Sequence, residues 1–224
     1  MLTLHRAAMA AFALVLAGCG EAASNSDSKA PAAAAKPAHE KESGIKASDM
    51  VIGDPNAPVT IIEYASATCP HCAVVDAEIL PEIKKAYIDT GKAKLVFREF
   101  WTPPQELSMV GAIVARCAAE KGGRDAYFAV MGNLFRTQET WISQNWKTEL
   151  EKLSAQAGMD KAAFDACLKR QDIFDMLQAQ FKEATDKMNV TGTPAFFVNG
   201  EKTASYSKED ISKAIDAALT KSGG

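Results

Sequence analysis

A pair of cysteines, Cys69 and Cys72, constrains the fold most, because it separates two segments of different periodicity. The segment before it, VTIIEYAS, is rich in β-branched residues and predicts a buried strand. The segment after it, AVVDAEILPEIKKAYIDTG, has apolar residues at helical spacing and ends in a glycine. A second strand, KAKLVFREF, follows. The sequence therefore predicts a β–α–β unit with CPHC at its strand-to-helix junction.

The rest of the chain continues this unit in a recognisable order. Residues 103–189 contain five amphipathic segments with helical periodicity, separated by Gly, Asn or Asp. GTPAFFVNGE then predicts a strand, an Asn-Gly turn and a partner strand, and SKEDISKAIDAALTKSG predicts a closing helix. This order is similar to that of the α/β thioredoxin fold with an inserted α-helical domain. We expect residues 48–102 and 190–224 to form the thioredoxin-like domain and residues 103–189 the insertion.

The first residues, MLTLHRAAMAAFALVLAGC, form an export signal that is too short for the roughly 20 apolar residues of a membrane span. The end of this signal resembles a bacterial lipobox, which implies cleavage after residue 18 and acylation of Cys19. An ordinary signal cleaved nearby, or a short uncleaved anchor, remains the alternative. Residues 19–47 are mostly Ala, Ser, Lys, Glu and Pro and predict a disordered tether. We therefore expect a membrane-anchored lipoprotein in the periplasm.

Charge and cysteine content narrow the function further. The net charge of -3, without a basic cluster, gives no reason to expect nucleic acid as a partner. Export places the chain where disulfides persist. If Cys19 of the five cysteines carries lipid, an even number of four remains.

The CPHC pair itself favours redox chemistry over two alternatives. A structural zinc site needs four ligands, whereas the mature chain offers one CxxC with His39 and His71, so we predict no metal site. A purely structural disulfide would close a loop of two intervening residues and so stabilise little, because the entropic gain grows with loop length.

The position of the pair predicts the direction of electron flow. Pro70 suits the first position of a helix, which places Cys69 at the N-cap, facing unpaired N–H groups and the positive end of the helix dipole. His71 adds to this effect if it is protonated or hydrogen-bonded to sulfur, although a solvated first-turn histidine is the alternative. A stabilised thiolate favours the reduced form, so the disulfide is expected to oxidise other thiols.

CPHC after a strand, GTPAFF after a helical insertion and GDPNAPVTIIEY before the motif together resemble the DsbA family of periplasmic thiol:disulfide oxidoreductases. The resemblance extends from about Met50 to the C-terminus. It implies that Cys69 is the nucleophile and that Cys72 resolves the mixed disulfide. It also implies that Pro194, preceded by Thr193, is cis and faces the cysteines, where it leaves a backbone edge for a substrate strand.

Three further residues take expected roles from the same resemblance. Glu63 matches a buried acidic residue that assists proton transfer around Cys72, with an exposed or ion-paired glutamate as the alternative. Cys117 and Cys167 match a non-catalytic bridge found in the helical domain of some family members. Two buried thiols remain the alternative for that pair.

The predicted function is that of a monomeric, cofactor-free enzyme that introduces disulfides into reduced exported polypeptides. The resemblance implies reoxidation by a quinone-linked membrane partner of the DsbB type. Thr193 leaves a reductase or isomerase open, because oxidases of the family often carry Val there and isomerases Thr. A tether in place of a dimerisation domain favours the oxidase. A copper or haem-thiol chaperone with Cys69, Cys72 and His71 as ligands is a third hypothesis.

Overall fold

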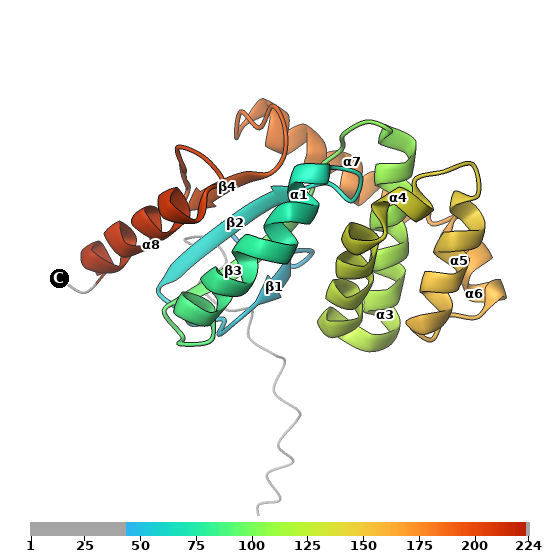
Figure 1. Ribbon diagram of the computed structural model, residues 1–224, viewed down its shortest axis with the longest axis horizontal. Helices are drawn as coiled ribbons and strands as arrows, with labels where there is room; N and C mark the ends of the chain where they lie inside the picture. Colours follow the sequence, from blue (N-terminus) through green and yellow to red (C-terminus); the bar gives the residue numbers. More distant parts are fainter. Residues whose placement is uncertain (1–43, 223–224) are drawn as a thin grey trace, which may run out of the picture. The chain divides into compact units, whose positions relative to one another are not determined.

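The computed structural model describes residues 44–222, so the predicted signal peptide, Cys19 and most of the predicted tether lie outside the described residues. Five strands form one sheet in the order β1-β3-β2-β4-β5. They are β1 (Met50–Ile52), β2 (Val59–Ala65), β3 (Ala93–Glu99), β4 (Ala195–Val198) and β5 (Glu201–Lys202). The central strands β2 and β3 run parallel, and the outer pairs are antiparallel (Figure 1).

The crossover from β2 to β3 is one helical segment with two π-helical stretches. It comprises α1 (Pro70–Val74), η2 (Val75–Ile79), α2 (Leu80–Ile83) and η3 (Lys84–Ile88). The inserted helices are α3 (Gln105–Arg136), α4 (Gln138–Trp141), α5 (Trp146–Gln156), α6 (Lys161–Cys167) and α7 (Gln171–Asp186), and α8 (Lys208–Ser222) closes the chain. This arrangement confirms the predicted thioredoxin fold with a helical insertion.

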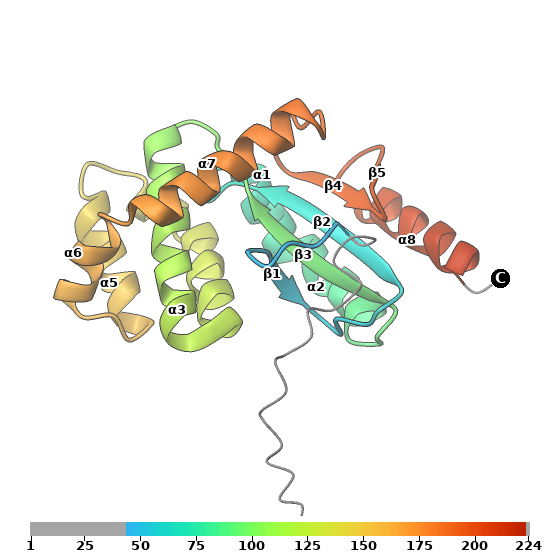
Figure 2. The same ribbon diagram turned by 180° about the vertical axis from the view of Figure 1, so that it is seen from behind.

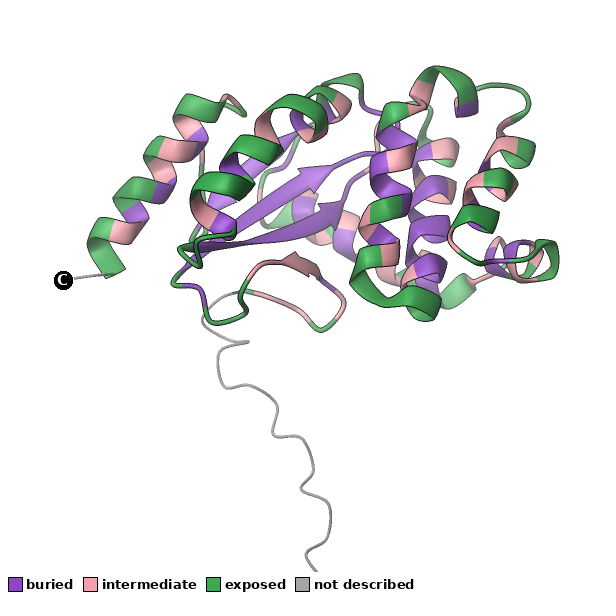
Figure 3. Ribbon diagram, turned by 60° about the horizontal axis from the view of Figure 1, so that its bottom comes forward, coloured by how far each residue is buried: buried purple, intermediate pink, exposed green. Residues whose placement is uncertain are grey.

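The two faces of the sheet pack against different helices, because side chains alternate along each strand. Ile61 and Phe196 belong to a buried cluster with residues of α2, η3 and α8. Tyr64 and Phe197 lie on the opposite face, where α7 packs across the sheet (Figure 2). Strands β2 and β3 are buried along their whole length (Figure 3). The sheet therefore gives a rigid platform whose central strand leads directly to the cysteine pair.

The apolar core of the insertion, which includes Trp141 and Leu134 from neighbouring helices, is continuous with Phe97 of β3 and with Cys72. The range of α3 contains the two helices that the sequence predicts, which meet at a kink at Gly123 (φ 70°, ψ -163°). That backbone conformation is open to glycine and strained for other residues. The four-residue helix α4 and the three-residue strand β1 were not predicted, because neither is long enough to show a periodicity.

The folded region begins earlier than the predicted boundary at residue 48. Buried Arg98 pairs with Asp49 and donates to the carbonyl of Gly44. Buried Arg116 pairs with Glu99 and donates to the carbonyl of Ser48. The last residues of the predicted tether therefore pack on the domain. No helix within residues 44–222 combines the length and the apolar character that crossing a bilayer requires.

Candidate active site

The cysteine pair lies where the sequence predicts it, directly beyond the end of β2. Cys69 is the N-cap of α1 and Pro70 is the first helical residue. The N–H of Cys69 donates to the carbonyl of Ser66 (3.0 Å), which closes a turn between strand and helix. Both cysteines are free thiols. Cys69 keeps 6% of its surface exposed and Cys72 none, so only Cys69 is open to attack.

A loop from the far end of the chain completes the site. The Thr193–Pro194 peptide bond is cis, as expected for the loop before β4. The Cys69 thiol donates to the carbonyl oxygen of Thr193, with 3.3 Å between sulfur and oxygen. The hydroxyl of Thr193 is buried and has no hydrogen-bond partner of good geometry among the described residues. The side chain of Thr193 nevertheless contributes a lowering of the pKa of both cysteines. The structure therefore brings the predicted proline loop and the predicted nucleophile together.

The environment separates the acidities of the two thiols. The pKa of Cys69 is lowered to about 5, first by a hydrogen bond from the Cys72 thiol and then by Thr193 and by the backbone N–H groups of Cys72 and His71, which together outweigh desolvation. The pKa of Cys72 is raised far above its usual value, first by burial and then by its contact with Cys69. The lowered pKa of Cys69 agrees with the expected stabilisation of its thiolate, to which the backbone N–H groups of the helix start and the Cys72 thiol both contribute.

The imidazole of His71 lies at the surface beside Tyr206, with 6.0 Å between the ring centroids. Its backbone N–H contributes to the lowered pKa of Cys69. Tyr206 and Val74 are the large apolar side chains exposed in the described part of the chain, at 36% and 45%. Val74 follows Cys72 by two residues on α1, so both exposed apolar side chains belong to segments that carry or contact the CPHC motif.

Glu63 lies in the middle of β2 with 1% of its surface exposed. Its Oε2 atom has no hydrogen-bond partner among the described residues. Burial, with a smaller contribution from the charge of Asp76, raises the pKa of Glu63 to about 8. Burial also raises the pKa of Asp76, and the charge of Arg136 opposes that shift. Asp76 is not among the residues predicted from the sequence, although its spacing of four residues from Cys72 places both on one face of a helix.

Cys117 and Cys167 form a disulfide in the structure, with an S–S distance of 2.11 Å and 6.1 Å between their Cα atoms. The bond joins α3 to α6 inside the helical insertion and spans 50 residues of sequence. It lies within the apolar core of the insertion. The two buried thiols considered as the alternative are therefore not what the structure contains.

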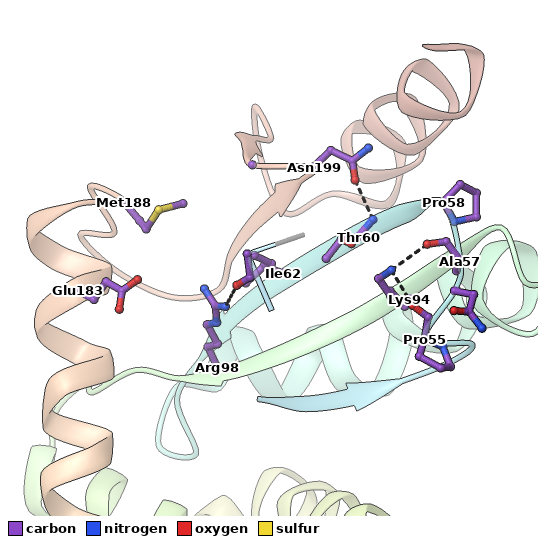
Figure 4. A pocket seen from close by; sticks show the side chains of 13 residues that line it. Pro55, Ala57, Pro58, Thr60, Ile62, Lys94, Arg98, Glu183, Met188 and Asn199 are labelled. Carbon is purple, nitrogen blue, oxygen red and sulfur yellow. Dashed lines mark hydrogen bonds between the residues drawn. The ribbon is translucent and has the colours of Figure 1, made fainter. Parts of the chain in front are cut away.

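A pocket of about 660 Å³ opens on the sheet face that carries Thr60 and Ile62 (Figure 4). Its Lys94 ammonium donates to the backbone carbonyls of Pro55 and Ala57, so its cation is already engaged. Neither cysteine of the CPHC motif lines this pocket. Within residues 44–222, no three His, Cys, Asp or Glu side chains are grouped to hold a metal ion.

A strand that leads to a CxxC at a helix N-terminus, facing a cis-proline loop, defines a dithiol redox protein of the thioredoxin class. The comparisons agree. Residues 45–217 match the thioredoxin family. The chain belongs to that family and, within it, to the DsbA-like protein-disulfide oxidoreductases.

Two relatives and one solved structure illustrate the similarity. A Rickettsia prowazekii protein named as a protein-disulfide oxidoreductase is 38% identical over 76% of this chain, and the match spans only 61% of that relative. A Bacillus cereus protein named as disulfide bond formation protein D is 30% identical over 76% of this chain and 78% of its own length. The crystal structure of Wolbachia pipientis alpha-DsbA1 has a TM-score of 0.71 and 29% identity, covering 80% of this chain and 94% of that chain.

Proposed function

We propose that this protein is a thiol:disulfide oxidoreductase that introduces disulfides into exported proteins through Cys69 and Cys72. The observation that carries the proposal is the contrast between the two sulfurs. Cys69 is the accessible sulfur with a pKa near 5, and Cys72 is fully buried with a raised pKa. A dithiol with one stabilised thiolate favours its reduced form, so its disulfide accepts electrons from substrate thiols.

The reaction balances in two exchange steps. A substrate thiolate attacks the Cys69 sulfur of the Cys69–Cys72 disulfide, a mixed disulfide forms, and Cys72 leaves and takes up a proton. A second substrate thiolate then attacks the substrate sulfur of that mixed disulfide, and Cys69 leaves as the thiolate that its surroundings stabilise. The substrate loses two electrons and gains a disulfide, and the enzyme ends with both cysteines reduced.

Glu63 and the proline loop take supporting roles in this proposal. With a pKa near 8, the Glu63 carboxyl is mostly protonated at neutral pH and can exchange a proton with buried Cys72 as that sulfur leaves. The Thr193 carbonyl oxygen, 3.3 Å from the Cys69 sulfur, marks the backbone edge where an extended substrate segment adds beside the nucleophile. Val74 and Tyr206 are available to contact apolar side chains of an unfolded substrate.

We also propose that the chain is exported and lipid-anchored through Cys19, acts as a monomer and is reoxidised by a DsbB-type membrane protein. The support for the anchor is the signal sequence and its lipobox-like end. Replacing Cys19 by Ser should release the protein from the membrane fraction and prevent incorporation of labelled fatty acid. Unchanged fractionation of that variant would refute the anchor and leave the redox proposal intact.

The deciding experiment for the redox proposal is equilibration of the Cys69–Cys72 couple with glutathione, followed by oxidation of a reduced, unfolded secretory protein. We expect a potential well above the roughly -270 mV of thioredoxin, and stoichiometric oxidation of the substrate by the disulfide form. A potential at or below the thioredoxin value would overturn the oxidase assignment.

Thr193 supports a second candidate, a disulfide reductase or isomerase, because the family resemblance associates threonine before the cis proline with isomerases. The effect of Thr193 on the two thiols runs the other way, since its side chain lowers both pKa values and so favours the reduced form of the pair. A scrambled substrate distinguishes the two functions. An isomerase that is added in its reduced form restores the native activity of the scrambled substrate protein. An oxidase instead acts on a reduced substrate protein, and only when the enzyme is added in its disulfide form.

A further inference from the structure

The turn that presents the nucleophile is held by a side chain from the helical insertion. Gln138, the first residue of α4, reaches the segment between β2 and α1. Its amide nitrogen lies 2.9 Å from the carbonyl oxygen of Ala67 and 3.0 Å from that of Cys69. One amide group therefore donates to two carbonyls of the turn that ends in the reactive cysteine. Neither the sequence pattern nor the proposed mechanism gives this residue a role.

Of the two carbonyls that Gln138 contacts, that of Cys69 bears on the position of the reactive sulfur, because both belong to the same residue. It already accepts the first helical hydrogen bonds, from the N–H groups of Cys72 (3.1 Å) and Ala73 (3.2 Å). Cys69 has φ -84° and ψ 118°, and ψ sets both the carbonyl direction and the start of the following helix relative to the side chain. Pro70 has no N–H with which to hold this peptide unit. A donor that fixes the Cys69 carbonyl therefore also fixes the sulfur relative to the first turn of α1.

Gln138 is itself held firmly enough to do this. Three residues later, the fully buried Trp141 donates its indole N–H to the carbonyl of Leu134 (2.8 Å) and fixes α4 in the core of the insertion. The Thr137 hydroxyl donates to the carbonyl of Asn133 (2.7 Å) at the end of α3. The amide of Gln138 therefore extends from a packed helix end.

A second set of contacts holds the same turn independently. The hydroxyl of Ser66 lies 2.7 Å from that of Ser108 and accepts from that of Thr102 (2.8 Å). The hydroxyl of Thr68 donates to the carbonyl of Thr102 (3.0 Å). These hydroxyls anchor the side chains of the turn. Gln138 alone, among these groups, donates to the carbonyl of the nucleophile itself.

We propose that Gln138 is a positioning residue of the exchange reaction, which holds the Cys69 carbonyl so that the Cys69 sulfur stays beside the first-turn amides of α1 and the Thr193 carbonyl. The helical insertion thus acts on the chemistry through one amide. This inference rests on the proposed redox function. Without the amide, the peptide unit after Cys69 rotates more freely, and the thiolate spends less time beside its donors.

Two replacements of similar size test the proposal, each in the full chain. Gln138→Met keeps the length of the side chain and removes both donors. Gln138→Glu keeps the shape and places a carboxylate against the two carbonyls, near the thiolate. The matched control is Gln171→Met on α7, whose amide donates only to exposed Asp175 (2.8 Å). The readouts are the ultraviolet titration of the Cys69 thiolate and the equilibrium constant with glutathione.

For Gln138→Met we expect the ionisation constant of Cys69 to fall about fivefold, as for the loss of one net hydrogen bond, and the disulfide to become a weaker oxidant. Gln138→Glu should act in the same direction and more strongly, because its charge also disfavours the thiolate. Thermal unfolding of each variant establishes that it is folded before titration. The control should titrate like the parent protein.

Two outcomes separate this inference from the proposed function. If the parent exchanges with glutathione and both folded variants titrate as it does, Gln138 has only a structural role and the inference is wrong. If the parent itself shows no acidic thiol and no exchange, the redox function fails first. A loss of melting temperature alone, with the titration and the equilibrium constant unmoved, would also count against the proposal.

Discussion

Replacing Glu63 by Gln should abolish a large pH dependence of stability. In the folded protein the Glu63 carboxyl has a pKa near 8, because it is buried and lies near Asp76, whereas its ordinary value is 4.5. Between these two pH values the folded state holds one proton more than the unfolded state. Raising the pH therefore favours unfolding, by about 1.4 kcal/mol for each pH unit. The sum is about 5 kcal/mol over the whole interval and about 3 kcal/mol by pH 7.

The variant keeps the shape of the side chain and removes its titration. Its amide brings a fixed penalty, because Oε2 of Glu63 has no hydrogen-bond partner among the described residues and an unpaired buried donor costs about 1–3 kcal/mol. That penalty is the same at every pH. The difference in unfolding free energy, variant minus parent, should therefore rise by about 3 kcal/mol between pH 4.5 and pH 7, whatever its starting value.

Urea unfolding at several pH values, with the catalytic cysteines kept reduced as in the structure, measures this difference. Glu78→Gln is the matched control, since Glu78 lies exposed on the helix that follows the cysteines. Its curve should run parallel to that of the parent protein. If the Glu63→Gln curve also runs parallel to the parent, the carboxyl titrates normally, and the role proposed for it as a proton donor to Cys72 fails with it.

Substitutions at three other places test separate parts of the structure. Replacing both Cys117 and Cys167 by Ala should lower the free energy of unfolding in urea by about 4 kcal/mol, as expected for a cross-link spanning 50 residues, and leave the glutathione equilibrium unchanged. Thr193→Val removes a hydroxyl that lowers the pKa of the nucleophilic thiol, so the ultraviolet titration midpoint should move up, and an unmoved midpoint would exclude that contact. Arg116→Met leaves the buried Glu99 carboxylate without its cation and should cost about 3–5 kcal/mol of unfolding free energy, part of which Glu99→Gln in the same chain should restore.

The elements that the sequence predicts well are those with a local physical cause. The strand before Cys69 and the helix after it follow from periodicity, and the N-cap position of Cys69 follows from a proline that tolerates only the first turn. The Asn-Gly turn fixes the hairpin of β4 and β5 in the same way. In each case, the residues that determine the structure are adjacent in the chain.

The parts that could not be predicted depend on contacts between distant segments. Gln138 reaches a turn about 70 residues away in sequence, from a helix too short to show any pattern. Residues 44–47 have the composition of a tether, yet the carbonyl of Gly44 accepts a hydrogen bond from the guanidinium of Arg98 on β3. A single sequence carries no record of such pairings, because each partner alone is an ordinary polar residue at the surface of a helix or in a loop.

The two sulfurs of the site differ for a reason that the fold itself supplies. A strand that ends beneath a helix N-terminus places the first cysteine among backbone N–H groups and the second cysteine one turn deeper, in the apolar layer between helix and sheet. The surroundings of Cys69 stabilise its thiolate. Burial destabilises the ionised form of Cys72, and it has the same effect on the carboxylate of Glu63. A thiolate at Cys69 is thus a good leaving group toward the substrate. Cys72 remains protonated, and so seldom attacks the mixed disulfide to release the substrate unoxidised. The proposed oxidase activity therefore depends on both shifts together, the lowered pKa of Cys69 and the raised pKa of Cys72.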